Sequence, residues 1–267
     1  MKAGACRQYK PVDFHNHVWA KEGKLNREEA RWLLDAADIL GIDRVCISLP
    51  LMSDSPTPAE FRDCNDVVFE AMAFSDRLLG FCFVNPGYAD ESLAEMERCI
   101  VHGGMIGVKL YHQYLICDPA LRPVMTYAAR LGVPVLMHAG KVMDSVSQRQ
   151  QPRLSHAGHF LKAVEMFPET ILVQGHIGGG GDWEWNLRTL EGLKPSAKYY
   201  LDTSGGVIDA GIVRRTVATL GEDRVLFATD MSFEEGVGKV LEAGLSEGQL
   251  QKVFSGNFYR ILSERRV

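Results

Sequence analysis

The chain has 267 residues, 46% of them apolar, and its formal net charge at pH 7 is −5. This length suits one α/β barrel domain over residues 1–267, because such barrels take about 250 residues. The chain has no basic run longer than Arg265-Arg266 near its end, so its charge pattern argues against binding to nucleic acid or to an anionic membrane. We therefore expect a small-molecule partner, and neither nucleic acid nor a membrane.

The sequence also carries signals about location. No apolar stretch approaches the roughly 18 residues that a membrane span needs, and the opening segment MKAGACRQYK lacks the apolar core of a secretory signal. The 6 cysteines form no CxxC pair, so we expect them to be reduced. Both features favour a cytoplasmic location.

Short apolar runs that are typical of strands alternate with helical segments along the chain, which is the pattern of a parallel sheet built from βα units. The predicted strands cover residues 12–17, 44–49, 79–84, 106–111, 133–138, 170–176, 199–203 and 224–229. Eight strands of this kind close a barrel. The predicted fold is therefore α/β, a single (β/α)8 TIM barrel.

The helices between the strands are marked by start and stop residues. Asn26 precedes a helical run over 27–40, and Gly41 follows it at the position where a left-handed residue ends a helix. The run Thr57-Pro58-Ala59-Glu60 has the N-cap, first-turn proline and third-position glutamate of a capping box. We expect these helices to coat the outside of the barrel.

Five of the predicted strands end on, or close to, a side chain that can bind a divalent metal ion. His15 and His17 lie two apart, so they point to the same face of one strand. A parallel barrel collects the carboxyl ends of all its strands around one mouth. The sequence therefore predicts a metal site at the carboxyl ends of the strands, built from His15 and His17 in VDFHNH, Lys109 in IGVKLYH, His138 in VPVLMHAG, His176 in ILVQGH and Asp230 in VLFATD.

These motifs, in this order, resemble the amidohydrolase superfamily, and specifically its amidohydrolase-related branch, amidohydrolase family 2. The resemblance covers nearly the whole chain and includes a closing segment at 256–262. It implies a metal-dependent barrel enzyme, and homodimers are common in that branch. The matching residues are Asp13-Phe14-His15-Asn16-His17, Gly107-Val108-Lys109-Leu110, His138-Ala139-Gly140, His176-Ile177-Gly178-Gly179 and Thr229-Asp230.

The resemblance also implies roles for the site residues. One divalent ion, zinc by preference and manganese as the alternative, would be held by His15, His17, His138 and Asp230. His176 would act as an acid, a base or an electrophile, or would join the ligands if a second, less favoured ion were bound. Asp230 would also carry a proton between water and a leaving group.

Lys109 allows two interpretations under the same resemblance. Some members of the superfamily carboxylate this lysine so that it bridges two metals, whereas in the single-metal branch it stays a cation near the site. The motif GVKL favours the uncarboxylated form. In that form Lys109 would orient the substrate or pair with a carboxylate.

The connection over 139–158 follows the strand that bears His138, so it should arch over the mouth of the barrel. A loop of this length is either a lid that recognises substrate or an ordinary solvated loop. An arginine fork suits a carboxylate or phosphate, and a tryptophan suits an apolar or ring-shaped group. The candidate substrate-binding residues are Arg149, Arg153 and Trp183, with Lys141 and Trp185 beside them.

Three functions fit this constellation. Our leading hypothesis is hydrolysis of a C–O or C–N bond in a lactone, ester or amide by water that a metal ion activates. The alternative is a zinc-dependent, non-oxidative decarboxylation of an aromatic or unsaturated carboxylic acid, because the same branch contains decarboxylases. A metal-holding protein without catalysis is disfavoured, because a structural zinc is normally closed by four protein ligands and needs no additional base.

Overall fold

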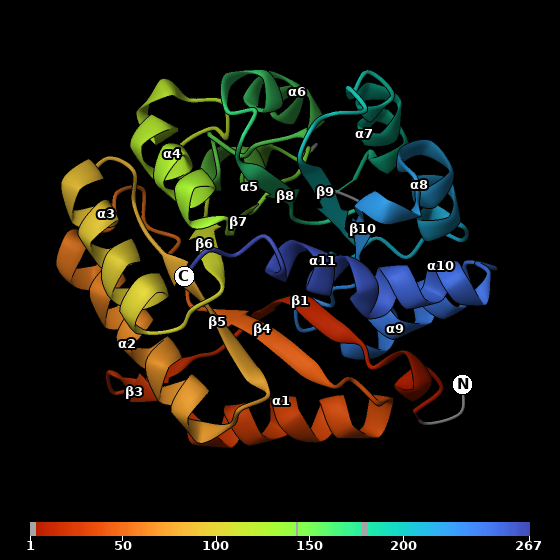
Figure 1. The fold of residues 1–267 in the computed structure, drawn as a ribbon, viewed down its shortest axis with the longest axis horizontal. Coiled ribbons are helices and arrows are strands. Elements are labelled where there is room, and N and C mark those ends of the chain that lie inside the picture. Colours follow the sequence, from red (N-terminus) through yellow and green to blue (C-terminus); the bar gives the residue numbers. More distant parts are fainter. Residues whose placement is uncertain (1–3, 143, 178–180) are drawn as a thin grey trace.

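The computed structural model describes residues 4–142, 144–177 and 181–267. Its centre is a parallel sheet whose strands follow one another in chain order around a barrel (Figure 1). This arrangement confirms the predicted TIM barrel. The strands are β1 (Val12–His17), β4 (Arg44–Ser48), β5 (Leu78–Phe83), β6 (Gly107–Leu110), β7 (Pro134–Met137), β8 (Ile171–Gln174), β9 (Tyr199–Asp202) and β10 (Val225–Leu226).

The barrel closes where the chain after β10 meets β1. The backbone N–H of Phe14 donates to the carbonyl of Phe227 over 2.9 Å, and the N–H of Asp230 donates to the carbonyl of His15 over 2.8 Å. The register of β1 against β4 shifts between Asp13 and Asn16, as a bulge would cause. His15 therefore lies in the bulge of β1, directly at the closing seam and beside Asp230.

Several strands end earlier than predicted, because the chain leaves the sheet before its apolar pattern ends. Strand β8 ends at Gln174 and β10 at Leu226, whereas the prediction extended them to 176 and 229. His176 has a φ of +69° and Asp230 a φ of +48°, which are left-handed values that extended strands cannot adopt. The same early exit places His138 just after β7.

The helices coat the outside of the barrel (Figure 1) and begin and end at the expected signals. Thr57 and Glu60 form the predicted reciprocal capping box, and Gly41 ends α1 with a φ of +84°. The helices are α1 (Arg27–Leu40), α2 (Pro58–Phe74), α3 (Ala89–Met96), α4 (Arg122–Leu131), α5 (Ser145–Gln150), α6 (Ala157–Met166), α7 (Trp183–Leu190), α8 (Ile212–Leu220), α9 (Phe233–Leu241), α10 (Glu247–Gln251) and α11 (Asn257–Leu262).

The structure also contains several small elements. A hairpin pairs β2 (Ala20–Lys21) with β3 (Lys24–Leu25) directly after β1. Short 3₁₀ turns cover Arg7–Tyr9, Pro119–Leu121 and Glu222–Arg224, and π turns cover Glu97–His102 and Lys252–Gly256.

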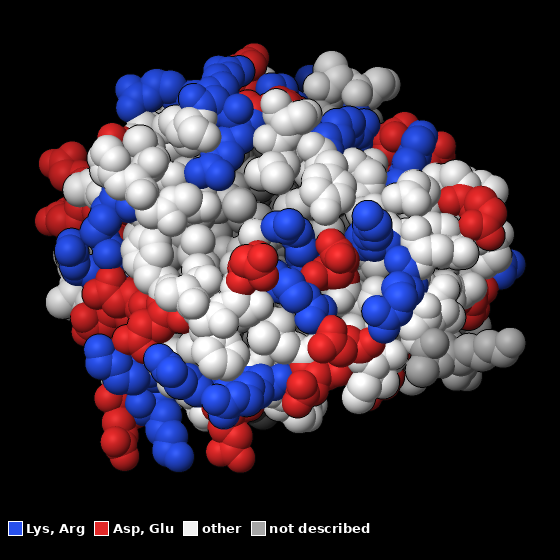
Figure 2. Space-filling model, turned by 60° about the horizontal axis from the view of Figure 1, so that its bottom comes forward, with Lys and Arg blue, Asp and Glu red and all other residues white. Residues whose placement is uncertain are grey.

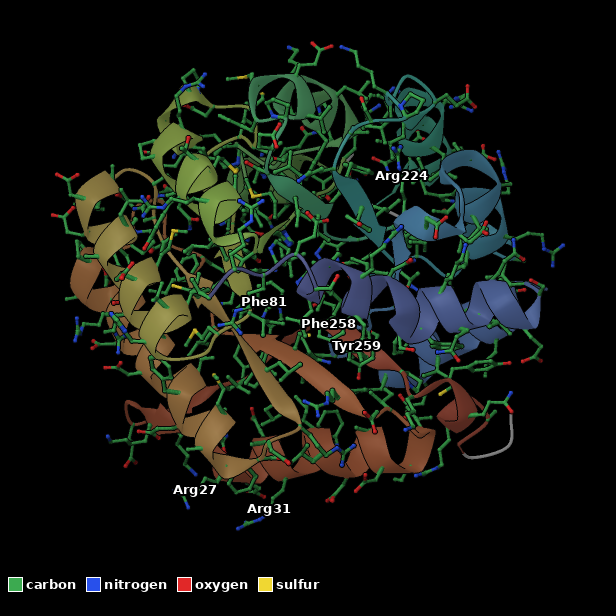
Figure 3. The ribbon with its side chains drawn as sticks, viewed as in Figure 1. Arg27, Arg31, Phe81, Arg224, Phe258 and Tyr259 are labelled. Carbon is green, nitrogen blue, oxygen red and sulfur yellow. The ribbon has the colours of Figure 1, made fainter. Side chains whose placement is uncertain are left out.

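The amino-terminal end of the barrel is filled by apolar side chains. The ring of Phe14 packs edge-to-face on Phe81 at 5.3 Å and on Phe258 at 6.2 Å between centroids. Phe258 comes from α11, which lies close to β10 and across this end of the barrel (Figure 3). Because this end is packed shut, the polar strand ends at the opposite mouth are where a ligand can enter.

The outer surface carries charges of both signs, and Figure 2 shows them interspersed over the face that it presents. Among the described residues, no helix is long and apolar enough to cross a membrane. The cysteines Cys6, Cys46, Cys64, Cys82, Cys99 and Cys117 carry free thiols, as expected.

Candidate metal centre

The carboxyl ends of the strands bring the predicted residues together although they are far apart in sequence. The Nε2 atom of His17 lies 3.1 Å from Oδ1 of Asp230, and Nδ1 of His176 lies 3.6 Å from Oδ2 of the same carboxylate. The ring of His15 lies 5.0 Å from that of His176 and 5.3 Å from that of His17. These four side chains share one site.

Two sets of three donors in this site have a spacing that a metal ion could use. His15, His17 and Asp230 each offer one atom, and these atoms lie within 4.8 Å of one another. His15, His176 and Asp202 form a second set with the same spacing. Imidazole nitrogen and carboxylate oxygen are ligands that zinc and manganese accept, so the residues present fit a divalent ion.

The ionisation of these groups also fits a metal centre. Burial and the positive charge of Lys109 lower the pKa of His15 to about 4, so this imidazole is neutral at pH 7. Burial alone would raise the pKa of Asp230, but His15, His17 and His176 hold it well below its usual range. Neutral imidazoles and an ionised carboxylate are the forms that bind metals.

Asp202, at the end of β9, is a site residue that the sequence patterns did not single out. Its Oδ2 lies 2.9 Å from Nδ1 of His15, and its Oδ1 accepts the backbone N–H of His176 over 2.8 Å. Burial raises the pKa of Asp202, but His15 and the hydroxyl of Ser204 outweigh it and bring the pKa to about 2. Asp202 could have been identified from the sequence as a carboxylate near the end of a predicted strand.

Lys109 lies inside the barrel below the mouth. Its side chain is fully buried, and its Nζ lies 2.5 Å from Nε2 of His15. Burial lowers the pKa of Lys109 to about 8, although Asp230 and Asp202 act in the opposite direction. Lys109 therefore lies directly beside the histidine, and its uncarboxylated state stays a prediction.

His138 belongs to the same cluster but faces a different set of partners. Its Nδ1 lies 2.9 Å from Nε2 of His176, and its Nε2 lies 2.9 Å from Oε1 of Gln151. The ring of Tyr111 stacks on it at 4.3 Å. Among the described residues, His138 is in neither set of three donors, so its role as a ligand stays a prediction.

The backbone around the centre is strained and tightly packed. His176 and Asp230 both have positive φ, which costs free energy in residues other than glycine and is concentrated at functional sites. Gly205 has a φ of +93°, and a Cβ there would lie 3.0 Å from the Cβ of His176. Only glycine fits at 205 without displacing the histidine.

A cavity of about 220 Å³ opens over the centre. His138, His176 and Asp230 line it, together with Gln151 and Leu154 from the long connection over 139–158. That connection therefore contributes directly to the wall of the cavity, as a lid would. Its other wall residues include Val142, Gly205 and Gly206.

The predicted substrate-binding residues lie elsewhere in the described part of the chain. Arg149 and Arg153 are exposed on the long connection. Trp183 is buried, and its Nε1 donates to Oδ2 of Asp209 over 2.6 Å. Lys141 lies over the ring of Trp185 at 3.7 Å. Within residues 4–142, 144–177 and 181–267, the lining of the cavity includes none of them, and their contact with a substrate stays a prediction.

Comparison with known proteins adds a family match and several similar folds. The family model described as Amidohydrolase, of the amidohydrolase-2 type, matches residues 12–263. Gly178 and Gly179 of the motif HIGG lie outside the described residues. No curated protein matches the sequence.

Three similar solved structures represent two kinds of chemistry. A dihydroxybenzoic acid decarboxylase from Polaromonas sp. JS666, with bound manganese and the inhibitor 2-nitroresorcinol, is 18% identical with a TM-score of 0.73, over 96% of this chain and 98% of that one. A 5-carboxyvanillate decarboxylase from Sphingomonas paucimobilis is 17% identical with a TM-score of 0.74, over 96% and 99%. A 4-oxalomesaconate hydratase from Rhodopseudomonas palustris is 16% identical with a TM-score of 0.70, over 95% and 96%. At these identities the likeness shows a shared fold.

Proposed function

The chain belongs to the amidohydrolase-2 family, and from this premise we propose that it is a metal-dependent decarboxylase of a small aromatic or unsaturated carboxylic acid. The family match confirms the resemblance seen in the sequence motifs. Membership in a family of metal-dependent enzymes also weakens the hypothesis of a binding protein without catalysis. The observation that carries the proposal is the meeting of His15, His17 and Asp230 next to an open cavity that Asp230 lines.

The ion would be held by His15, His17 and Asp230, with His138 as a further candidate ligand. When bound, it supplies a Lewis acid that offsets negative charge on an oxygen of the substrate. Manganese is bound in one of the similar decarboxylase structures, whereas our preference for zinc rests on the resemblance alone. Lys109, buried beneath the site, adds a positive charge that favours an anionic substrate.

Decarboxylation replaces a carboxylate on carbon by a proton, so a group that carries a proton must face the substrate. Asp230 and His176 both line the cavity, and the side chain of Asp230 is 26% exposed. His176 lies 3.6 Å from Oδ2 of Asp230, close enough for the two groups to share the work of holding and moving a proton. We assign proton transfer to this pair.

Two features support a ring-sized acid as substrate. The cavity of about 220 Å³ is smaller than the roughly 300–1,000 Å³ typical of sites for drug-sized ligands. Two of the similar structures are decarboxylases of ring acids, dihydroxybenzoic acid and 5-carboxyvanillate. Together they favour decarboxylation over the hydrolysis that the sequence placed first.

Hydrolysis of a lactone, ester or amide is the second candidate. Asp230 is a carboxylate whose pKa is held low, and it stands beside His17 at the open side of the site. A carboxylate in this position can accept a proton from water as well as donate one to carbon. The same two residues therefore serve either reaction.

The test compares the two reactions in one preparation. The purified protein, loaded with Mn²⁺ or Zn²⁺, is incubated with dihydroxybenzoic acids and 5-carboxyvanillate while release of carbon dioxide is measured, and with lactones and esters while uptake of base is measured. Carbon dioxide release that requires the metal supports the proposal. Base uptake without carbon dioxide supports hydrolysis instead. Absence of both reactions from the loaded protein contradicts both assignments.

A further inference from the structure

The carboxylate of Asp202 is saturated with hydrogen bonds although no solvent reaches it. Its Oδ1 accepts three donors: the backbone N–H of His176 over 2.8 Å, the backbone N–H of Ser204 over 3.0 Å and the hydroxyl of Ser204 over 2.6 Å. Its Oδ2 faces Nδ1 of His15 over 2.9 Å. The orientation of this carboxylate is therefore fixed by groups on both sides.

His15 lies between this carboxylate and the side chain of Lys109. Its Nδ1 faces Oδ2 of Asp202, and its Nε2 lies 2.5 Å from Nζ of Lys109. Oδ1 of Asp202 accepts from three donors, and a carboxylate has no proton to donate, so Nδ1 of His15 must be the donor to Oδ2. This contact requires the tautomer of His15 that has its proton on Nδ1 and its lone pair on Nε2, the nitrogen that faces Nζ of Lys109.

We propose that Asp202 is the positioning residue of the metal centre, which holds His15 in the Nδ1–H tautomer. The lone pair on Nε2, which faces Nζ of Lys109 in this structure, is then the one that a metal ion would take in place of that contact. Through its Oδ1, Asp202 also anchors the backbone of His176, whose φ is positive. The role toward the ion rests on the proposed function, but the tautomer of His15 does not depend on it.

The same contacts decide between the two sets of three donors. The set of His15, His176 and Asp202 would need Asp202 as a ligand. Its Oδ1 already accepts three hydrogen bonds, and its Oδ2 is the partner of His15. Asp202 is therefore an outer partner that orients a ligand, as carboxylates do for metal-bound histidines, and the ion belongs with His15, His17 and Asp230.

Substitution Asp202→Asn tests this arrangement because it keeps the size of the side chain. The amide oxygen should stay with the three donors at the Oδ1 position, which turns the amide NH₂ toward Nδ1 of His15. Nδ1 must then accept a hydrogen bond, so the proton moves to Nε2 and blocks the lone pair there. Affinity for Mn²⁺ should fall about 10-fold to 100-fold.

Ser204→Ala is the matched control. It removes the hydroxyl that donates to Oδ1 of Asp202 and that lies 3.0 Å from Nδ1 of His176 and 3.4 Å from Nδ1 of His15, but it leaves the shorter contact between Oδ2 and His15. The variant should keep the Nδ1–H tautomer and bind Mn²⁺ more tightly than Asp202→Asn does.

The deciding measurement is the ¹⁵N NMR spectrum of the full-length protein with ¹⁵N-labelled histidines at pH 7. Spectra are recorded before and after addition of Zn²⁺. The signals of His15 are assigned by their absence from a His15→Gln variant. We expect a proton on Nδ1 in the wild type and in Ser204→Ala, and on Nε2 in Asp202→Asn. A wild-type His15 with its proton on Nε2 overturns the proposal, even if Asp202→Asn does not fold. So does an Asp202→Asn protein that keeps the proton on Nδ1. The tautomer is observed without any catalysed reaction. Failure of the tautomer proposal can therefore be distinguished from failure of the decarboxylase proposal.

Discussion

His17 and Asp230 come from the two sides of the closing seam of the barrel and meet with 3.1 Å between Nε2 and Oδ1. The seam itself is held by the hydrogen bond from the N–H of Asp230 to the carbonyl of His15. The residues that close the fold are thus the residues that build the centre. A substitution of the Asp230 side chain should therefore change the activity and leave the backbone hydrogen bond that closes the barrel in place.

Asp230→Asn should abolish most of the activity without unfolding the protein. The backbone hydrogen bond to His15 persists in the variant, whereas the negative charge that we propose binds an ion and moves a proton is lost. We expect kcat to fall about 10²-fold to 10⁴-fold. Steady-state kinetics measure the loss, and thermal unfolding monitors the fold. Glu165→Gln, which alters an exposed carboxylate paired with Lys194, should leave both unchanged.

Gln151→Ala tests whether the long connection works as a lid. Gln151 contacts His138 over 2.9 Å and lines the cavity, while its neighbour Arg149 is exposed. Loss of one hydrogen bond of this kind costs about 0.5–1.5 kcal/mol, or roughly 2-fold to 13-fold in kcat/KM. Arg149→Ala should have little effect. Equal effects of the two substitutions on kcat/KM would show that the loop does not act through Gln151.

The pair of the buried Glu95 and the half-buried Arg98 predicts a dependence of stability on pH. Burial alone would raise the pKa of Glu95, but Arg98 and Asn65 hydrogen-bond its carboxylate and bring the pKa below the usual 4.5. The folded state therefore binds this proton less readily than the unfolded state does. The stabilisation is present above pH 4.5 and is lost as the pH falls through the folded pKa.

Glu95→Gln should thus lower the free energy of unfolding at pH 7 by about 1–3 kcal/mol, because a charge-assisted hydrogen bond is lost in the interior. Urea unfolding at pH 7 and at pH 3 measures the difference between wild type and variant. That difference should shrink at the acid pH, where the wild-type carboxylate is increasingly protonated. A difference that grows on acidification would contradict a lowered pKa for Glu95 in the folded state.

Phe258→Ala separates stability from chemistry, because it lies at the packed end of the barrel. Its ring is buried against Phe14, on the side away from the cavity. We expect the free energy of unfolding to fall by about 3–5 kcal/mol, while kcat at a temperature where the variant is folded stays close to the wild-type value. A large fall in kcat of the folded variant would mean that the two ends of the barrel are coupled.

The fold was predictable because the signals for it are local. Strand β1 has the predicted bounds, and the capping box at Thr57 marks the start of α2. The strand ends were less accurate where the chain turns into a loop, since the positive φ of His176 arises from contacts with residues distant in sequence. The pattern of apolar residues along the sequence gives no information about such contacts.

The candidate site was predictable in part for a related reason. His15, His17 and Asp230 were found because each follows an apolar run, and a parallel barrel makes such positions converge. Asp202 satisfies the same rule but was overlooked, because a single aspartate in a strand has no second metal-binding residue close to it in the sequence. Arg149 and Trp183 were expected on loops, but they lie in α5 and α7. Their positions could not be predicted, because the path of the chain between strands depends on its tertiary contacts.

The measurement that tests the central claim most directly is the metal content of the purified full-length protein, determined by mass spectrometry. We predict about one zinc or manganese ion per chain in the wild type and in Glu165→Gln, and loss of this ion in the double variant His15→Ala, His17→Ala. Two ions per chain in the wild type would contradict an uncarboxylated Lys109 in a single-metal site. A double variant that retains a stoichiometric ion would contradict the metal centre itself.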